Sequence, residues 1–381
     1  YNSKLTPRFM IRNLIVTILS FAVAGLFALF AFNLTVFNPI AQVVTDFEMT
    51  DVYYHILQDG DILEDSPDIV IVDMSDLYSR REIAATLDAI GKQKPRVVGV
   101  DVVFEGLKED TLGDAMIFET AAKYDNIVYS YKLLDYQNDS IGYAESVHSF
   151  FAEAVPVMEG FTNMQRNLYG GLKRQLSLGR RYQGKLQPSF ITKVVNTYQG
   201  KEIYKPLDKD LNINFSPRHY RVINPEDVSK SGDLIRGKVV LFGAMKDEYD
   251  MHYTPLGKIA GVELLGYAID TLINQTEVKS ASGWQQWIIA FLLVFFTETI
   301  FSFYKNRVSR IGNRFWRFLL SATFFRSYLM FLWMAVWVWL GFILFCKYNF
   351  SLNFGWAFSA IAFLVLAEGI IKESIEAYNS K

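Results

Sequence analysis

The sequence predicts an α/β extracytoplasmic domain with a mixed, mostly parallel sheet and helices on both faces, joined to an all-α membrane region of four transmembrane helices. Two observations lead to this fold class. Long uncharged apolar runs stand near both ends of the chain, and strand and helix patterns alternate between them. The composition agrees, because 51% of the 381 residues are hydrophobic and 15% are aromatic.

Four apolar stretches are candidates for membrane spans. A helix needs about 20 residues to cross a hydrocarbon core about 30 Å thick. The stretches cover residues 14–32, 287–303, 322–345 and 354–371. The first is longer than a signal-peptide core, and Asn33-Leu34-Thr35 is a poor cleavage site, so we interpret it as an uncleaved anchor.

The basic residues predict the orientation of these spans. The segment between the second and third spans contains no acidic residue but holds Lys305, Arg307, Arg310, Arg314 and Arg317. Because basic loops are retained in the cytoplasm, both termini are predicted to be cytoplasmic. The chain is then divided into residues 1–33 (amino terminus and first span), 34–283 (extracytoplasmic domain), 284–372 (three spans) and 373–381 (cytoplasmic tail).

The extracytoplasmic region alternates strand and helix patterns. Buried strands are predicted at 68–73, 96–104, 127–131 and 239–242, and helices at 80–92, 112–123, 187–198 and from 261. Such alternation is typical of right-handed βαβ units. Two further strands, 161–164 and 170–178, are expected to pair antiparallel around Gly170-Gly171, and Pro188 to stand early in its helix. A stalk helix is expected at 41–58.

Polar side chains follow three of the predicted strands. Asp73 and Asp101 lie at strand ends, and Asp250 and His252 lie in the loop after 239–242. Carboxyl ends of parallel strands meet at one edge of a sheet, so these four side chains could hold a metal or a polar ligand there. The alternative, which we favour, is that such acids cap helix starts and loop amides. The spacing selects no metal.

Composition and motifs argue against several functions. A net charge of −2 without a large basic stripe outside the membrane argues against nucleic acid as a partner. No nucleophile elbow, phosphate-binding glycine loop or paired-His motif is present, so we expect neither an enzyme nor a cofactor. A dense basic cluster outside the membrane contains Lys173, Arg174, Arg180 and Arg181. One interpretation is that it binds an anionic ligand or a partner, and the other is that it is the solvated face of a strand.

Three ionisable residues lie in or near the last three spans. Glu298 is within the second span, where an unpaired carboxylate is costly. Arg326 enters the third span and Glu368 leaves the fourth span from the same side. We predict that Glu298 and Arg326 are close and that Glu368 joins them. The alternative for Arg326 and Glu368 is that they extend toward the interface.

Residues 47–274 resemble the second type of CHASE sensor domain, an extracytoplasmic module often found in front of bacterial cyclases and histidine kinases. The resemblance rests on strands 68–73 and 97–104, on Gly160-Phe161-Thr162-Asn163, on Gly171 and Arg174, and on 237–261 with Asp250, Thr254-Pro255 and Gly257. Two features depart from the family pattern. Tyr78-Ser79-Arg80-Arg81 replaces the usual Trp-Pro run, and Gly170 replaces an acid.

The resemblance implies a sensor of the bacterial inner membrane that binds a ligand or partner, with Asp73, Asp101, Asp250, His252 and Arg174 as candidate ligand-binding residues. The alternative is a non-enzymatic docking subunit of an envelope complex. The predicted partners are membrane lipid, a second membrane chain and a possible cytoplasmic effector after Lys381. The second chain is either another copy in a homo-oligomer or a partner membrane protein, and the mid-span residues Trp333, Trp337 and Trp339 indicate it. We expect the helix from Gly261 to link the domain to the spans.

Overall fold

The computed structural model describes residues 6–33, 48–60, 64–163, 171–216 and 218–379. The chain divides into two compact units. The α/β unit is Tyr54–Val278, and the helical unit combines Tyr1–Tyr53 with Lys279–Lys381. The chain therefore passes between the units twice, after Tyr53 and after Val278.

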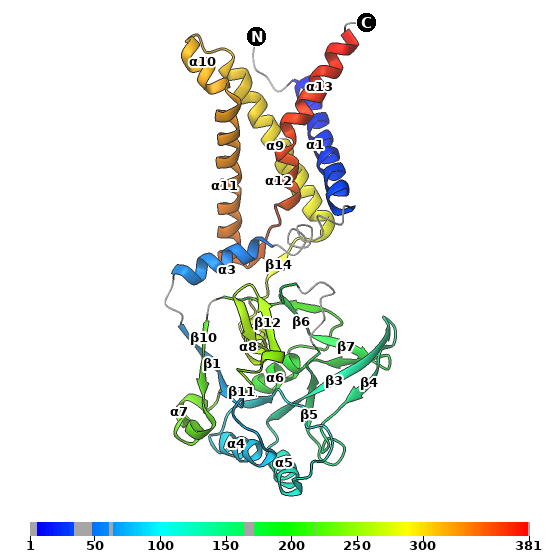
Figure 1. The fold of residues 1–381 in the computed structure, drawn as a ribbon, viewed down its shortest axis with the longest axis vertical. Helices are drawn as coiled ribbons and strands as arrows, with labels where there is room; N and C mark the ends of the chain where they lie inside the picture. The colour runs from blue at the N-terminus through cyan, green and yellow to red at the C-terminus, as the bar shows by residue number, and fades with distance from the viewer. Residues whose placement is uncertain (1–5, 34–47, 61–63, 164–170, 217, 380–381) are drawn as a thin grey trace. The chain divides into compact units, whose positions relative to one another are not determined.

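A nine-stranded sheet, counted over the described residues, forms the centre of the α/β unit (Figure 1). Its order is β10 (Arg218–Ile223), β1 (Glu64–Asp73), β11 (Val239–Gly243), β2 (Val97–Val100), β3 (Ile127–Asn138), β4 (Gly142–Val147), β7 (Gly179–Tyr182) and β8 (Lys185–Pro188), with β5 (Met158–Phe161) paired to β3. The pairs from β10 to β3 and from β3 to β5 are parallel, whereas β3–β4 and β7–β8 are antiparallel. The expected mixed, mostly parallel sheet is confirmed.

Helices cover both faces of this sheet. The Val- and Ile-rich strands β1, β11 and β2 are buried on both sides, as continuous apolar runs predict. On one face, Val72, Val100 and Phe242 pack with α4 (Arg80–Lys92) and α5 (Thr111–Lys123). On the other face lie α6 (Phe190–Gln199) and α8 (Gly261–Ile273). Glycine is needed at Gly99, because a Cβ there would lie 2.9 Å from the Phe190 ring.

Side-chain caps fix where the helices begin. At α4, Ser79 and Glu82 form a capping box in which each side chain accepts from the other residue's backbone N–H. At α6, the Ser189 hydroxyl accepts from the Thr192 N–H at 3.4 Å. Pro188 therefore ends β8 and does not lie inside α6, so the sequence-based helix start was about three residues early.

The predicted antiparallel pair around Gly170-Gly171 is wrong. Strand β5 pairs parallel with β3, whereas β6 (Gln175–Ser177) pairs antiparallel with β9 (Asp210–Asn212). Residues 164–170 lie outside the described residues. The reason is burial, since Gly160 of β5 lies against the α6 backbone, where a Cβ would come within 2.5 Å of the Phe190 Cα. That packing places β5 inside the sheet.

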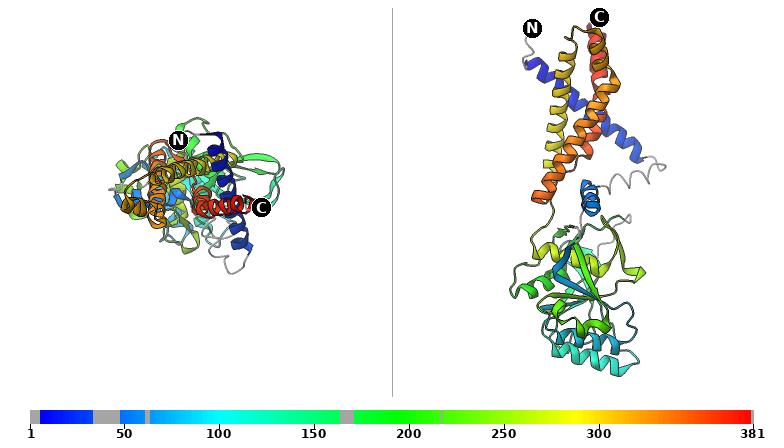
Figure 2. Two further views of the ribbon diagram at one scale, coloured as in Figure 1. Left: turned by 90° about the horizontal axis from the view of Figure 1, so that it is seen from above. Right: turned by 90° about the vertical axis from the view of Figure 1, so that its left-hand side faces the viewer.

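The helical unit contains α1 (Pro7–Asn33), α9 (Gly283–Val308), α10 (Arg314–Ser321), α11 (Thr323–Tyr348), α12 (Gly355–Ala362) and α13 (Leu364–Asn379). Figure 2 shows α1 crossing the other helices obliquely. Its core includes Val16 of α1, Val294 of α9 and Ile361 of α12. A short parallel bridge joins β14 (Lys279–Ser280) to β15 (Phe350–Ser351).

The number of spans differs from the expectation. By length and composition, three helices of the described chain could cross a membrane: Pro7–Leu29, Gly283–Val308 and Thr323–Tyr348. The predicted fourth span is a pair of helices, α12 and α13, bent by 44° at Phe363. Of the predicted stalk helix, α3 (Met49–Gly60) is observed, and residues 41–47 lie outside the described residues.

Candidate functional site

The carboxyl edge of the sheet brings Asp73 and Asp101 to either side of Gly243. Asp73 pairs with Gly243 in the strand register, and the Asp101 N–H donates to Phe242 O at 2.9 Å. A Cβ on Gly243 would lie 2.9 Å from Val262 of α8 and 3.3 Å from the Asp101 Cβ. The glycine thus allows α8 to approach this edge closely.

Asp73 is held by the loops around it. Its Oδ1 accepts from the Ser75 N–H at 2.9 Å and from the Met245 N–H at 3.1 Å, and the Lys246 Nζ lies 3.8 Å from its Oδ2. Burial opposes ionisation, but the bonds from Ser75 and Met245 outweigh it and hold the pKa of Asp73 below 3.8. Asp73 therefore joins two loops, which is the capping role we favoured.

Asp101 has a different environment, shared with Asp250 and His252. Burial raises the pKa of Asp101 to about 7; the Asp250 carboxylate adds to the rise, while His252 and Lys132 oppose it. The His252 Nε2 lies 3.3 Å from Asp250 Oδ1. These three side chains form the edge cluster. At neutral pH it can bind or release a proton, and it can bind a cationic or hydrogen-bonding group.

The start of α8 supports Asp250. A Cβ on Gly261, the first residue of α8, would lie 2.3 Å from Asp250 Oδ2, so the carboxylate rests directly on the helix terminus. A helix amino terminus carries partial positive charge and favours an anion there. In the described part of the chain, no group of three or more His, Cys, Asp or Glu side chains is placed to hold a metal ion.

The segment carrying Arg174 lies beside the hairpin that holds His252. This hairpin consists of β12 (Met251–Thr254) and β13 (Gly257–Ala260). The Lys173 N–H donates to Tyr253 O at 2.7 Å, and Arg174 O accepts from the Ile213 N–H at 2.9 Å. The other two residues of the basic cluster have carboxylate partners nearby. Arg180 pairs with Asp210 and with Asp208, and the Arg181 Nε lies 3.8 Å from Asp208 Oδ2.

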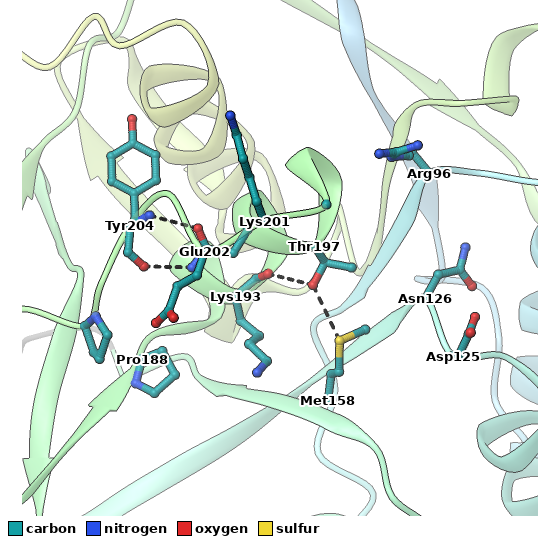
Figure 3. A pocket seen from close by; sticks show the side chains of 13 residues that line it. Arg96, Asp125, Asn126, Met158, Pro188, Lys193, Thr197, Lys201, Glu202 and Tyr204 are labelled. Atoms are coloured by element: carbon teal, nitrogen blue, oxygen red, sulfur yellow. Dashed lines mark hydrogen bonds between the residues drawn. The ribbon is translucent and has the colours of Figure 1, made fainter.

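A cleft of about 730 Å³ lies at the opposite edge of the sheet (Figure 3). Arg96 precedes β2, Asp125 and Asn126 precede β3, and the end of α6 closes the other side. The charged side chains that line it are Arg96, Asp125, Lys193, Lys201 and Glu202. Sequence reasoning missed this cleft because it considered only residues at strand ends. The signal was a run of charged residues before β2 and β3 and after α6.

The helical unit contains a separate cluster of charges, the bundle cluster. Glu298 is 1% exposed and accepts from the Ser302 hydroxyl at 2.8 Å. Arg12 lies 3.9 Å from Glu298 and 3.7 Å from Glu368. Glu368 also pairs with Lys305.

Arg326 belongs to the bundle cluster through Glu368. Its Nη2 lies 3.9 Å from Glu368 Oε2, and the described residues show no direct pair between Arg326 and Glu298. The prediction paired Arg326 with Glu298, whereas in the structure Arg326 lies beside Glu368, and Glu368 is the carboxylate shared by Arg12, Lys305 and Arg326. Arg12 and Lys305 were missed because they lie near helix ends, where a basic residue is common and does not by itself indicate a buried partner. Together the cluster joins α1, α9, α11 and α13.

Two of the mid-span tryptophans face their own bundle. The Trp333 Nε1–H donates to Thr297 Oγ1 at 3.0 Å, and Trp337 packs on the bundle core. Only Trp339 points outward, with 60% of its surface exposed. Of the three tryptophans, Trp339 is the one whose exposed surface supports the prediction of a partner chain.

The arrangement defines a class of protein: an α/β domain with polar sites at both sheet edges, inserted between apolar helices that could span a membrane. A family model for the CHASE2 domain matches residues 21–299, and the chain belongs to this family. CHASE2 domains are extracytoplasmic sensory domains of signalling proteins. Comparisons with curated proteins and with solved structures found no match.

Proposed function

We propose that this protein is a sensor of the bacterial inner membrane, in which the α/β unit binds a ligand or partner outside the cytoplasm and passes its state to the helical unit. The observation that carries the proposal is the extent of the family match. It begins at residue 21 inside α1 and ends at residue 299 inside α9. The sensory module therefore includes parts of both flanking apolar helices.

The distribution of charge supports the orientation in this proposal. No Asp or Glu lies between Glu298 and Glu368, whereas the segment from Lys305 to Arg317 is rich in arginine. By the positive-inside rule this segment is cytoplasmic. Both termini are then cytoplasmic, α12 and α13 act together as the fourth span, and Tyr54–Val278 lies outside.

The chemistry of the two edges supports binding without catalysis. In the edge cluster, His252 is paired with Asp250, and Asp250 rests on the α8 terminus. The cleft at the other edge presents cationic and anionic side chains together, which suits a small zwitterionic or anionic solute. We propose the edge cluster and the cleft as the two alternative binding sites for the ligand.

The route of the signal follows the chain. It crosses between the units only at Tyr53 and at Val278. The second crossing follows α8, whose first turn borders the edge cluster. We propose that α8 and the segment after it move when the ligand binds.

A ligand screen tests this function. The full chain in lipid nanodiscs would be challenged with amino acids, sugars, carboxylic acids and divalent cations, and the urea stability of Tyr54–Val278 followed by pulse proteolysis. A specific ligand at 100 times its Kd adds about 2.7 kcal/mol. Asp250→Asn should abolish this gain if the edge cluster is the site, and Lys193→Ala should abolish it if the cleft is.

A docking subunit of an envelope complex is the second candidate. It is favoured by the uncovered apolar surface of α11, which includes Phe331 and Trp339. A subunit would copurify with another membrane protein in fixed stoichiometry and gain nothing in the ligand screen. Quantitative mass spectrometry of gently purified protein therefore separates the two functions.

A further inference from the structure

Helix α10 lies between α9 and α11 and has a well-defined start. The Asn313 side chain accepts from the N–H groups of Phe315 at 3.0 Å and Trp316 at 3.3 Å. Figure 1 shows α10 at the end of the helical unit where α13 also ends. The Tyr304 hydroxyl of α9 donates to Leu320 O at 2.9 Å, so α10 is attached to the bundle.

The two faces of α10 differ in polarity, with Phe318, 74% exposed, standing beside Arg314 at the border of the arginine face. At helical spacing, Arg314 and Arg317 share one face, and Phe315, Trp316 and Leu319 share the opposite one. The apolar face is uncovered, with Phe315 65% and Trp316 51% exposed. Uncovered aromatic surface with arginines opposite is typical of a helix that lies in the plane of a membrane interface.

The charge around α10 indicates which lipid it meets. The nearest acids along the chain, Glu298 and Glu368, are engaged in the bundle cluster with Arg12, Lys305 and Arg326. Arg314 and Arg317 are exposed and make no ion pair among the described residues. Guanidinium groups bind phosphate with two parallel hydrogen bonds, which suits an anionic headgroup.

We propose that α10 is an interfacial helix that binds anionic phospholipid, with Phe315, Trp316 and Leu319 entering the acyl boundary and Arg314 and Arg317 contacting headgroup phosphate. The inference rests on the proposed insertion of α9 and α11 in the membrane, since these helices place α10 at the interface. It adds a lipid-recognition surface to the sensor. Changes in the anionic lipid content of the leaflet would then act on α9 and α11 directly.

Native mass spectrometry of the full chain from detergent tests the proposal. The protein is mixed with equal amounts of phosphatidylglycerol, which is anionic, and phosphatidylcholine, which has no net charge, and the lipid that stays bound to each is counted. Wild type should retain phosphatidylglycerol preferentially. Each basic residue near an anionic surface contributes a factor of about five, so Arg314→Gln with Arg317→Gln should weaken retention roughly 25-fold.

Two further variants serve as controls. Arg314→Lys with Arg317→Lys keeps the charge and should retain most of the preference. Lys347→Gln removes an exposed charge at the far end of α11 and should change nothing. Equal retention of both lipids by wild type, or unchanged retention by the double Gln variant, would overturn the proposal. Displacement of the lipid by millimolar inorganic phosphate would overturn it too, because the site would then bind free anions.

Carbonate extraction of membranes distinguishes this inference from the proposed function. If α9 and α11 span the membrane, the protein resists extraction whatever its lipid preference. Extractable protein would refute membrane insertion itself. Resistant protein without lipid preference would refute only the role of α10.

Discussion

Replacing Asp101 by asparagine should stabilise the α/β unit at neutral and alkaline pH. The pKa of Asp101 is raised from 3.8 to about 7, by burial first and by Asp250 second. A raised carboxyl pKa means that the fold favours the protonated form. The stability that this form provides is complete below pH 3.8 and is lost as the pH rises through 7.

The size of the effect follows from the same shift. Each pH unit between the two pKa values is worth about 1.4 kcal/mol, so ionisation costs the fold about 4 kcal/mol above pH 8. Asparagine has nearly the same shape and no charge. Asp101→Asn should therefore gain about 4 kcal/mol over wild type at pH 8 and nothing at pH 3.5.

The assay is urea unfolding of the full chain in nanodiscs, with peptides from Tyr54–Val278 counted after pulse proteolysis at several pH values. Tryptophan fluorescence is unsuitable, because all seven tryptophans lie in the helical unit between Trp284 and Trp356. The matched control is Glu119→Gln, which makes the same carboxylate-to-amide change at an exposed residue of α5, outside the edge cluster. A loss of stability in Asp101→Asn at pH 8, or a gain that does not depend on pH, would refute the reasoning.

Three further changes should have the following effects. Asp73→Asn should cost about 1–3 kcal/mol at pH 7 and progressively less as the pH falls below 3.8. The lowered pKa of Asp73 stabilises the fold above 3.8, and that contribution is lost on acidification; urea unfolding against pH measures it. Gly160→Ala should lower the melting temperature of the α/β unit by several degrees, since its Cβ would lie 2.5 Å from the Phe190 Cα; an unchanged melting curve would contradict that packing. Glu368→Gln should destabilise the helical unit by about 3–5 kcal/mol, because it leaves Lys305 and Arg326 without their carboxylate partner. Thermal melts followed by tryptophan fluorescence measure this loss. Glu376→Gln, at an exposed position of α13, is the control and should leave the melting temperature unchanged.

The parallel centre of the sheet was predictable, because buried parallel strands leave continuous Val and Ile runs. Strands β1, β2 and β11 carry such runs, and the helices between them carry caps such as Ser79. Strand β10 was missed, since its buried residues Tyr220 and Ile223 are separated by the exposed Arg221 and Val222 and so form no continuous apolar run. The β12–β13 hairpin was read as a polar loop with a turn at Thr254-Pro255.

The candidate site was only partly predictable, since identical local patterns lead to different environments. Asp73 and Asp101 both follow a buried strand, and sequence gave no reason to separate them. Ser75 and Met245 donate hydrogen bonds to Asp73, whereas Asp101 faces Asp250. Met245 and Asp250 are distant in sequence from both strands. Tertiary structure alone therefore decides that Asp73 accepts backbone hydrogen bonds and that Asp101 is buried beside a second carboxylate.

The cleft was not predictable for a related reason. Its lining comes from the beginnings of two strands and the end of α6, and the sequence has no motif that joins them. The bundle cluster was easier, because carboxylates in apolar helices are rare and need partners. Which cations supply those partners depends on how the helices cross.

The central claim is that the α/β unit controls the helical unit. The most direct measurement is tryptophan fluorescence of the full chain in nanodiscs, since every tryptophan reports on the helical unit. A compound that stabilises Tyr54–Val278 should change this fluorescence, and four glycines inserted between Val278 and Lys279 should abolish the change while the compound still stabilises the α/β unit. An unaltered fluorescence on binding, or the same change in the insertion variant, would contradict the claim.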